Sequence, residues 1–554
     1  MRLPAVLLSL VLSAAAQTTE PARTPAVRET PPDLKAYSEA SRIGDPQEKI
    51  EALEKFMHDF PHSARVRSAD YSILLTLMKS FPGQVVRIRS LAKRVYRAED
   101  AKDKGSLATQ IADRLLDGGV LLKDAEGYAK TGVQSMNLGQ YLRDQVVSYE
   151  KRKQKAPASD ELQKRFQKIR ARRVATLGRV EVKLGRTAKG QKLLEESYAV
   201  NPDDPAVAGT LGELAAKAGD ESKAIEYLIP ARLSGEAPET ANAALDSIYR
   251  KAHNGSLAGL DAMLDSEYRK RFPNPIRVEV YQPSDKRSDR LVLAEVFTGA
   301  GCGPCVGADV AFDAALGRYS RKDLAVVVYH LHIPQPDPMT NTDTQAVAKS
   351  DGVTAVPTFF IDGEKTVGGG ERGHAKDVFD HFQPALEKDL ESPAEARLKV
   401  DAVLAGNSVR VTAEVDAVDS ESKDLKLQMA LVEKELRYTG ENGVRFHPMV
   451  VRAMGGEHGL GFALQAGVAP RFDHTFDLDA VSAAIKEHLD DYEAKGHRGE
   501  SFKFREKKYR IDRGELAVVV FVQDDKTKHV LQSVYRDLSP EPGAHPVTEA
   551  NESR

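Results

Sequence analysis

The spacing of hydrophobic residues divides the chain into three parts with different periods. Over residues 34–272, apolar positions recur at the three- and four-residue intervals of amphipathic helices. Residues 276–390 combine apolar runs of strand length with helical stretches, as in an α/β unit. Over residues 393–540 the period falls to two, and Gly406-Asn407 separates two alternating runs, which indicates a β-hairpin. The pattern predicts a multidomain protein with a helical solenoid, an α/β domain and an all-β sandwich.

A repeat of 34 residues is visible near the end of the helical part. Gly178 falls on Gly212 and Gly185 on Gly219, while large apolar residues recur between them. This period is that of tetratricopeptide repeats, and residues 173–236 resemble two such units. The resemblance implies a TPR-like stack with a concave surface for a peptide or protein partner. A helical spacer without a partner is the alternative.

The first 16 residues have the layout of a secretory signal peptide. Arg2 precedes an apolar run, and three alanines form a small-residue cleavage site. Residues 17–33 are polar and rich in proline, as in a linker, and we expect residues 541–554 to be a disordered tail. No later stretch reaches the roughly 18 apolar residues that cross a bilayer, so we expect no transmembrane segment in the mature chain. These features predict an exported protein, either periplasmic or secreted and associated with the cell envelope.

Composition narrows the range of functions. Hydrophobic residues make up 41% of the chain, which is enough for packed cores. The 79 basic and 82 acidic residues nearly cancel to a net charge of −3, which disfavours a nucleic-acid binder that works by bulk positive charge. Residues 151–173 hold ten lysines and arginines, but acidic and apolar residues alternate with them, and we interpret this run as a solvated helix face.

The chain has two cysteines, and they stand three positions apart. An apolar run at residues 291–297 predicts a buried strand, followed by a short loop, Cys302-Gly303-Pro304-Cys305 and a helical stretch. At the start of a helix, unpaired N–H groups and the helix dipole stabilise a thiolate. A thiolate at Cys302 can attack a disulfide, and Cys305 lies close enough to resolve the mixed disulfide.

A second motif, Val356-Pro357-Thr358, precedes another apolar run. With Cys302-Gly303-Pro304-Cys305 it makes residues 276–390 resemble the thioredoxin-like fold. The resemblance implies that Cys302 is the nucleophile, that Cys305 is the resolving thiol of a redox-active disulfide, and that Pro357 is the cis-proline opposite the pair. It implies no cofactor.

Three departures from the thioredoxin-like pattern are visible. Gly301 stands where a tryptophan usually precedes the first cysteine. The usual buried acid, which takes the proton of the resolving cysteine, corresponds to Val296. Glu295 lies one residue earlier, and a strand bulge would make it the buried proton acceptor for Cys305. The distance between Cys305 and Pro357 requires an insertion, which we assign to residues 333–341 because three prolines there exclude regular structure.

Histidines near the cysteines leave a metal site as an alternative. His330 and His332 alternate at the end of a predicted strand, so both face one side, and two Cys with two His can hold Zn²⁺ or Cu⁺. Our main interpretation gives these histidines a packing role and predicts no bound metal. Further on, the order LVE…RFHPMVVRA resembles an exported bacterial family described as outer-membrane-related, and we expect His447 in it to be a hydrogen-bonded structural residue.

These observations favour an exported thiol–disulfide oxidoreductase that acts on protein disulfides through Cys302 and Cys305. Its partners would be a protein thiol or disulfide substrate and a peptide or protein on the helical repeats. The alternative is a non-enzymatic, extracytoplasmic interaction scaffold in which the Cys pair is a structural disulfide or a metal clip.

Overall fold

The computed structural model of the chain describes residues 30–366, 368–464, 470–497 and 501–538. The predicted signal peptide (1–16), most of the linker (17–33) and the tail (541–554) lie outside the described residues. Export therefore stays a prediction from the sequence. Among the described helices, none combines the length and the apolar character needed to cross a membrane.

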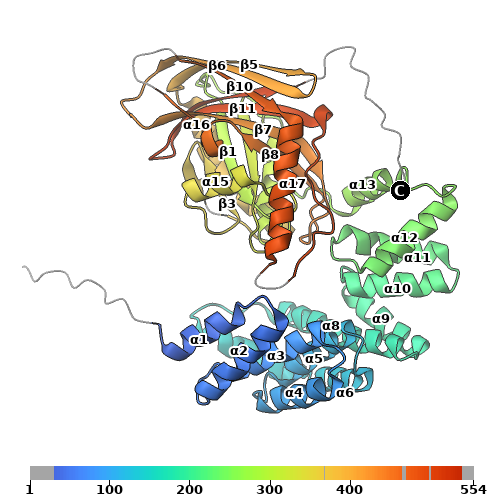
Figure 1. Cartoon of the computed structure of the whole chain (residues 1–554). Coiled ribbons are helices and arrows are strands. Elements are labelled where there is room, and N and C mark those ends of the chain that lie inside the picture. The colour runs from blue at the N-terminus through green and yellow to red at the C-terminus, as the bar shows by residue number, and fades with distance from the viewer. Residues whose placement is uncertain (1–29, 367, 465–469, 498–500, 539–554) are drawn as a thin grey trace, which may run out of the picture.

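The N-terminal part is helical, as the apolar period predicts. Its helices follow one another as a curved array of antiparallel neighbours (Figure 1). They are α1 (Pro32–Ser41), α2 (Pro46–Asp59), α3 (Val66–Ser80), α4 (Val85–Ala98), α5 (Lys104–Asp117), α6 (Leu122–Gln134), α7 (Leu138–Lys151), α8 (Ser159–Lys183), α9 (Thr187–Val200), α10 (Pro205–Lys217), α11 (Glu221–Leu233), α12 (Glu239–Ala252) and α13 (Leu260–Arg271).

The glycines of the 34-residue repeat have two structural roles. Gly185 and Gly219 end their helices with φ angles of +81° and +82°, which glycine adopts without steric cost. Gly178 and Gly212 lie where two helices touch, because a Cβ at Gly212 would come within 2.5 Å of the Leu228 side chain. The repeat therefore records a turn and a close helix contact in each unit.

A mixed sheet with helices on both faces follows the helical part. Its elements are β1 (Val292–Thr298), α14 (Cys305–Arg318), β2 (Leu324–His330), α15 (Thr342–Ser350), β3 (Thr358–Ile361), β4 (Glu364–Thr366) and α16 (Ala375–Glu391). β1 pairs in parallel with β2 and antiparallel with β3, and every residue of β1 and β2 is buried. α14 and α16 cover one face of these strands, and α15 with side chains of β7 (Leu425–Arg437) and β11 (Leu516–Asp524) covers the other, which explains why the strand sequences are continuously apolar.

The C-terminal strands extend this sheet. They are β5 (Ala396–Ala405), β6 (Ser408–Val418), β7 (Leu425–Arg437), β8 (Phe446–Met454), β9 (Phe462–Ala463), β10 (Arg471–Asp477), β11 (Leu516–Asp524) and β12 (Val530–Asp537). In the described ranges the sheet order is β12-β11-β7-β8-β2-β1-β3-β4, with β9 beside β7. β8 joins β2 through the parallel pair Val328 and Val450. The prediction of separate domains at residues 276–390 and 393–540 is corrected, because strands of both ranges share one sheet.

A smaller sheet, in the order β10-β6-β5, covers one face of the C-terminal strands. The β5–β6 hairpin turns at Gly406 and Asn407, where the sequence predicts it. Side chains of β5 and β6 pack against alternate residues of β7 and β11, so this part has two stacked β-layers. The helix α17 (Leu478–Lys495) lies beside β8 and β10, within a range that the period-two pattern assigns to strands.

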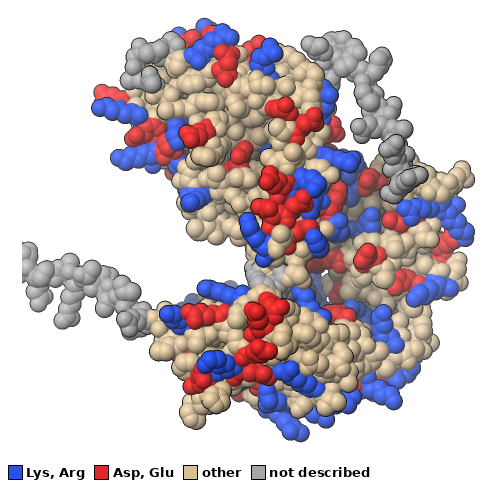
Figure 2. All heavy atoms as spheres, viewed as in Figure 1, with Lys and Arg blue, Asp and Glu red and all other residues tan. Residues whose placement is uncertain are grey.

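Charges on the helical part are mixed rather than segregated, and blue and red spheres alternate over the face seen in Figure 2. In the basic run, Arg165 pairs with Glu161 and Arg170 pairs with Glu196. Arg173 instead donates to the Gly132 carbonyl at 2.9 Å. These contacts agree with the interpretation of the run as a solvated helix face.

Candidate functional site around the cysteine pair

The two cysteines lie at the junction of β1 and α14. Cys302 is in the turn after β1, Cys305 is the first residue of α14, and their sulfurs form a disulfide. The Cys305 N–H donates to the Cys302 carbonyl at 3.1 Å, and the Gly307 N–H donates to Gly370 at 2.7 Å. The strand, loop and helix start are placed as the sequence predicts, so the positive end of the α14 dipole points at the pair.

Pro357 faces the cysteines from the start of β3. The Val356–Pro357 peptide bond is cis, and the Val356 carbonyl oxygen lies 3.8 Å from the Cys302 sulfur. Gly369 lies against the Pro357 ring, where a Cβ would come within 2.7 Å of it. Of the four predicted site residues, the fold therefore brings together Cys302, Cys305 and Pro357.

Glu295 does not join them. β1 pairs with β2 and β3 in continuous register, so the bulge that would turn Glu295 toward α14 is absent from this strand. Thr298, which contacts α14, is an odd number of positions away, and the two side chains therefore point to opposite faces of the sheet. The expectation that Glu295 accepts a proton from Cys305 is corrected, because the sheet separates the two groups.

A different carboxyl group lies on the cysteine side. Asp309 is one turn beyond Cys305 on α14 and accepts a hydrogen bond from the Thr298 hydroxyl at 2.8 Å. Burial raises its pKa to about 6. It also lines a cavity of about 310 Å³ between α13 and α14, together with Tyr268 and Arg372. Asp309 was not predicted as a site residue, although an acid four residues after Cys305 in an apolar helix was the available signal.

The Cys302 side chain is covered and only 2% exposed. The side chain of Asn442 reaches over its turn, and the inserted loop brings Gln335 against Gly301. A Cβ at Gly301 would lie 2.7 Å from the Gln335 Cβ, which explains why a tryptophan does not fit there. The neighbours Gly303 and Pro304 are exposed, as are residues 354–355 in the turn before Pro357.

The histidines near the site take part in hydrogen bonds. His330 Nδ1 lies 2.8 Å from an Asp337 oxygen that also accepts from the Ala300 N–H at 2.6 Å. His332 Nδ1 accepts from the Asp337 N–H at 2.9 Å. Asp337 thus connects both histidines to the turn that carries Cys302. In the described ranges, the one set of three acidic or histidine groups close enough to share a metal ion is on the surface, at Glu99, Asp100 and Asp103.

His447 has the structural place that the sequence analysis favours. It is buried, and its Nε2 lies 2.9 Å from the Tyr438 carbonyl oxygen. Burial and then the neighbouring His330 lower its pKa to about 3. The ring is therefore neutral at physiological pH and suited to donating one hydrogen bond to a backbone carbonyl.

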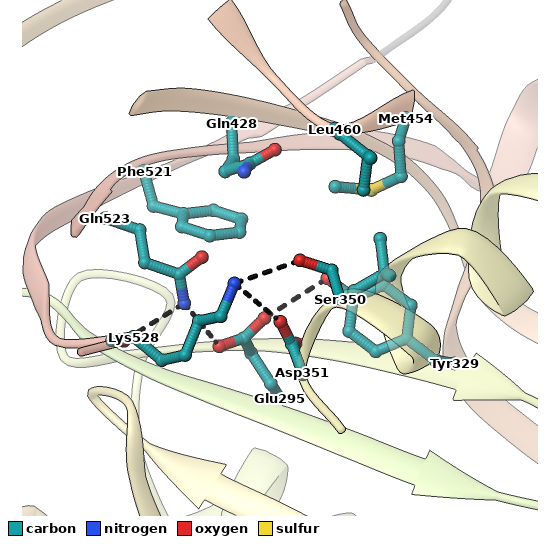
Figure 3. A pocket seen from close by; sticks show the side chains of 11 residues that line it. Glu295, Tyr329, Ser350, Asp351, Gln428, Met454, Leu460, Phe521, Gln523 and Lys528 are labelled. Atoms are coloured by element: carbon teal, nitrogen blue, oxygen red, sulfur yellow. Dashed lines mark hydrogen bonds and ion pairs between the residues drawn. The ribbon is translucent and has the colours of Figure 1, made fainter. Parts of the chain in front are cut away.

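Glu295 belongs to a polar cluster on the opposite face of the sheet (Figure 3). The Tyr329 hydroxyl donates to Glu295 at 3.3 Å, and the Gln523 amide donates at 3.2 Å. Lys528 pairs with Asp351 at 3.1 Å beside them. Burial and then the Asp351 charge raise the pKa of Glu295 to about 8. The enclosed space is about 10 Å³, which holds no more than one water molecule.

Comparisons with known proteins add little to this picture. Neither the protein-family models nor the curated proteins give a match to the sequence. A solved structure titled "MamA RS-1 ArsTM double mutant" matches 36% of this chain and 93% of its own, at 15% identity and a TM-score of 0.25. A similarity this low carries no argument about fold or function.

Proposed function

We propose that the chain is an exported thiol–disulfide oxidoreductase whose residues 276–390 form a thioredoxin-like domain. The observation that carries the proposal is the Cys302–Cys305 disulfide at the start of α14, with the Val356 carbonyl 3.8 Å from the Cys302 sulfur. The strand order β2-β1-β3-β4 and the helices on both faces support the thioredoxin-like resemblance. The layout of residues 1–16 supports export.

In the reductive direction, the Cys302 thiolate attacks one sulfur of a substrate disulfide. A mixed disulfide forms, and the other substrate sulfur leaves as a thiolate. The Cys305 thiolate then attacks the Cys302 sulfur, which releases the second substrate thiolate and restores the Cys302–Cys305 disulfide. Two electrons pass from the cysteine pair to the substrate, and a dithiol donor must return them. The same steps in reverse oxidise a substrate dithiol.

Asp309 is the group that we assign to the proton of Cys305. It lies one helical turn away and, with a pKa of about 6, is ionised at neutral pH and still basic enough to take a proton. The cavity that Asp309 shares with Tyr268 and Arg372 offers the proton a route to water. In this proposal Asp309 takes the role that the resemblance assigns to a buried acid on the strand.

The decisive experiment is to trap the mixed disulfide. In Cys305→Ser the first attack proceeds but the release step is lost, so substrate proteins should stay linked to Cys302 and separate after reduction. Cys302→Ser is the matched control and should trap nothing through the same position. If Cys305→Ser traps no protein and the intact chain reduces no model disulfide at any redox poise, the proposed function is wrong.

The burial of Cys302 favours a second candidate, an interaction scaffold with a static disulfide. A sulfur whose residue is 2% exposed has little surface for a visiting chain. Structural disulfides have reduction potentials below about −300 mV, whereas exchange-active pairs lie above this value. The potential of the Cys302–Cys305 couple, measured against glutathione, therefore separates the two candidates.

For the helical part we propose binding of a peptide or protein partner. Its helix pairs resemble tetratricopeptide units, and the array offers a curved surface of mixed charge (Figures 1 and 2). Deletion of the helical part should leave a protein substrate poorly recognised if it recruits substrates. The test measures the binding of substrate proteins to a Cys302→Ser chain. The measurement is repeated after the helical part has been added as a separate protein, which should compete for the substrate.

A further inference from the structure

Residues 438–445 connect β7 to β8 and lie between the cysteine turn and the helical part. We call this segment the 438–445 loop. One side of it contacts residues 299–302, and the other side contacts α13 and the turn after α11. Two segments distant in sequence are therefore joined through one short loop.

The tip of the loop holds the cysteine turn by hydrogen bonds. The Asn442 N–H donates to the Ala300 carbonyl at 3.0 Å, and its side-chain amide donates to the Cys302 carbonyl at 3.3 Å. The same amide lies 3.4 Å from the Gly299 carbonyl. A Cβ at Gly440 would come within 2.5 Å of the Ala300 oxygen, so the two backbones are in direct contact. These contacts hold the backbone of the turn on both sides of Cys302, whose residue is 2% exposed.

The base of the loop is fixed by one carboxylate of the helical part. Arg437 ends β7 and Arg445 directly precedes β8, so they mark the two ends of the loop. Asp265 of α13 accepts from Arg445 Nε at 2.7 Å and pairs with Arg437 Nη2 at 2.7 Å. Asp265 is 4% exposed and Arg445 is 5% exposed, so this pairing is screened little by salt.

Arg505, in the segment between α17 and β11, joins the loop to a second point of the helical part. Arg505 donates to the Thr439 carbonyl at 2.6 Å and also to the Gly235 carbonyl in the turn after α11. Gly235 has a φ of +77°, and a Cβ there would overlap the Gly440 carbonyl. The helical part thus presses on the same residues that cover the cysteine turn.

We propose that the 438–445 loop is a gate over Cys302 and that the helical part, chiefly through Asp265, holds this gate closed. The inference rests on the proposed function and deepens it, because it makes access to the disulfide depend on the contact between α13 and the loop. A closed gate limits reaction at Cys302, and a movement of α13 away from the loop releases both arginines and exposes the sulfur. Substrates that engage the helical part are then the ones admitted.

The test is the rate at which dithiothreitol reduces the Cys302–Cys305 disulfide in the full-length chain. Asn442→Ala removes the two side-chain contacts to the cysteine turn and should speed reduction by about fivefold to 25-fold, since each hydrogen bond shifts an opening equilibrium by roughly fivefold. Asp265→Asn weakens the base of the loop and should act in the same direction. Asp416→Asn is the matched control, because it removes an exposed pair with Lys399 and should leave the rate unchanged.

Hydrogen exchange of the amides in residues 438–445 provides a direct readout of the gate. Exchange should be faster in Asn442→Ala and Asp265→Asn than in Asp416→Asn. If Asp265→Asn does not fold, Asn442→Ala alone tests the gate. This variant should fold, since Asn442 is only partly buried and its replacement removes no charge. Unchanged reduction and exchange in folded Asn442→Ala would overturn the gate.

Failure of the gate and failure of the proposed function give different results. Faster reduction in the gate variants without any trapped mixed disulfide in Cys305→Ser would keep the gate and reject the oxidoreductase. Trapping in Cys305→Ser with an unchanged reduction rate in Asn442→Ala would keep the oxidoreductase and reject the gate.

Discussion

On one face of β1, Asp309 accepts a hydrogen bond from Thr298 one helical turn from Cys305; on the other face, Glu295 accepts from Tyr329 and Gln523. Burial raises the pKa of both carboxyl groups, to about 6 for Asp309 and about 8 for Glu295. The larger shift belongs to the group that the sheet separates from the cysteines. A raised pKa alone therefore does not show which carboxyl group could serve the cysteines, because only Asp309 lies on their side of the sheet.

The largest expected effect is a difference between Asp309 and Glu295 in the rate at which substrate leaves the mixed disulfide. If Asp309 takes the Cys305 proton, Asp309→Asn should slow the release of substrate from the mixed disulfide about 100-fold at pH 7. In Asp309→Asn the rate of release should also no longer rise with pH near 6. Single-turnover kinetics of release measure both. Glu295→Gln is the matched control, and a comparable slowing there would show that the sheet does not separate the roles.

The next effect concerns the polar cluster around Glu295. Lys528→Met removes the cation that pairs with Asp351 at 3.1 Å and leaves buried carboxylates without compensation. We expect a loss of about 3 kcal/mol in the free energy of unfolding at pH 8. Lys399→Met, which breaks an exposed pair with Asp416, should cost at most about 1 kcal/mol. Urea unfolding measures both, and equal losses would contradict a structural role for the cluster.

The variants Asp309→Asn and Glu295→Gln should each stabilise the fold at neutral pH. A carboxyl whose native pKa lies above its unfolded value binds protons more tightly when folded, so stability falls as pH rises from the unfolded pKa to the native one. For Asp309 this window runs from 3.8 to about 6, and for Glu295 from 4.5 to about 8. At pH 7 each amide should add on the order of 2 kcal/mol, and at pH 3.5 almost nothing. If the gain in the free energy of unfolding were the same at pH 7 and pH 3.5, the raised pKa values of Asp309 and Glu295 would be contradicted.

The smallest expected effect tests the hydrogen bond from the Thr298 hydroxyl to Asp309. The Thr298 hydroxyl lowers the Asp309 pKa against the effect of burial. Thr298→Val should therefore raise the pH at which substrate release becomes fast, by less than about one unit. The pH profile of release measures this shift. A shift to lower pH would show that Thr298 does not donate to the ionised carboxyl.

Features set by neighbours in sequence were predicted well. The helical period of residues 34–272, the strand before the cysteines, the helix after them and the hairpin at Gly406 are all present. Each follows from a local pattern, since side-chain periodicity and turn residues act over a few positions. The contacts of the cysteine turn with the 438–445 loop and with Gln335 were not predicted, because these segments meet the turn only in the folded chain.

The sequence by itself determined where the candidate site lies, because two cysteines at the start of a helix define it within four consecutive residues. Only the tertiary structure decided which acid accompanies them, since the face to which Glu295 points depends on strand register and not on residue type. It also decided that β8 joins β2 and that α13 reaches the cysteine turn through a loop. Such pairings link residues more than a hundred positions apart, and no local pattern encodes them.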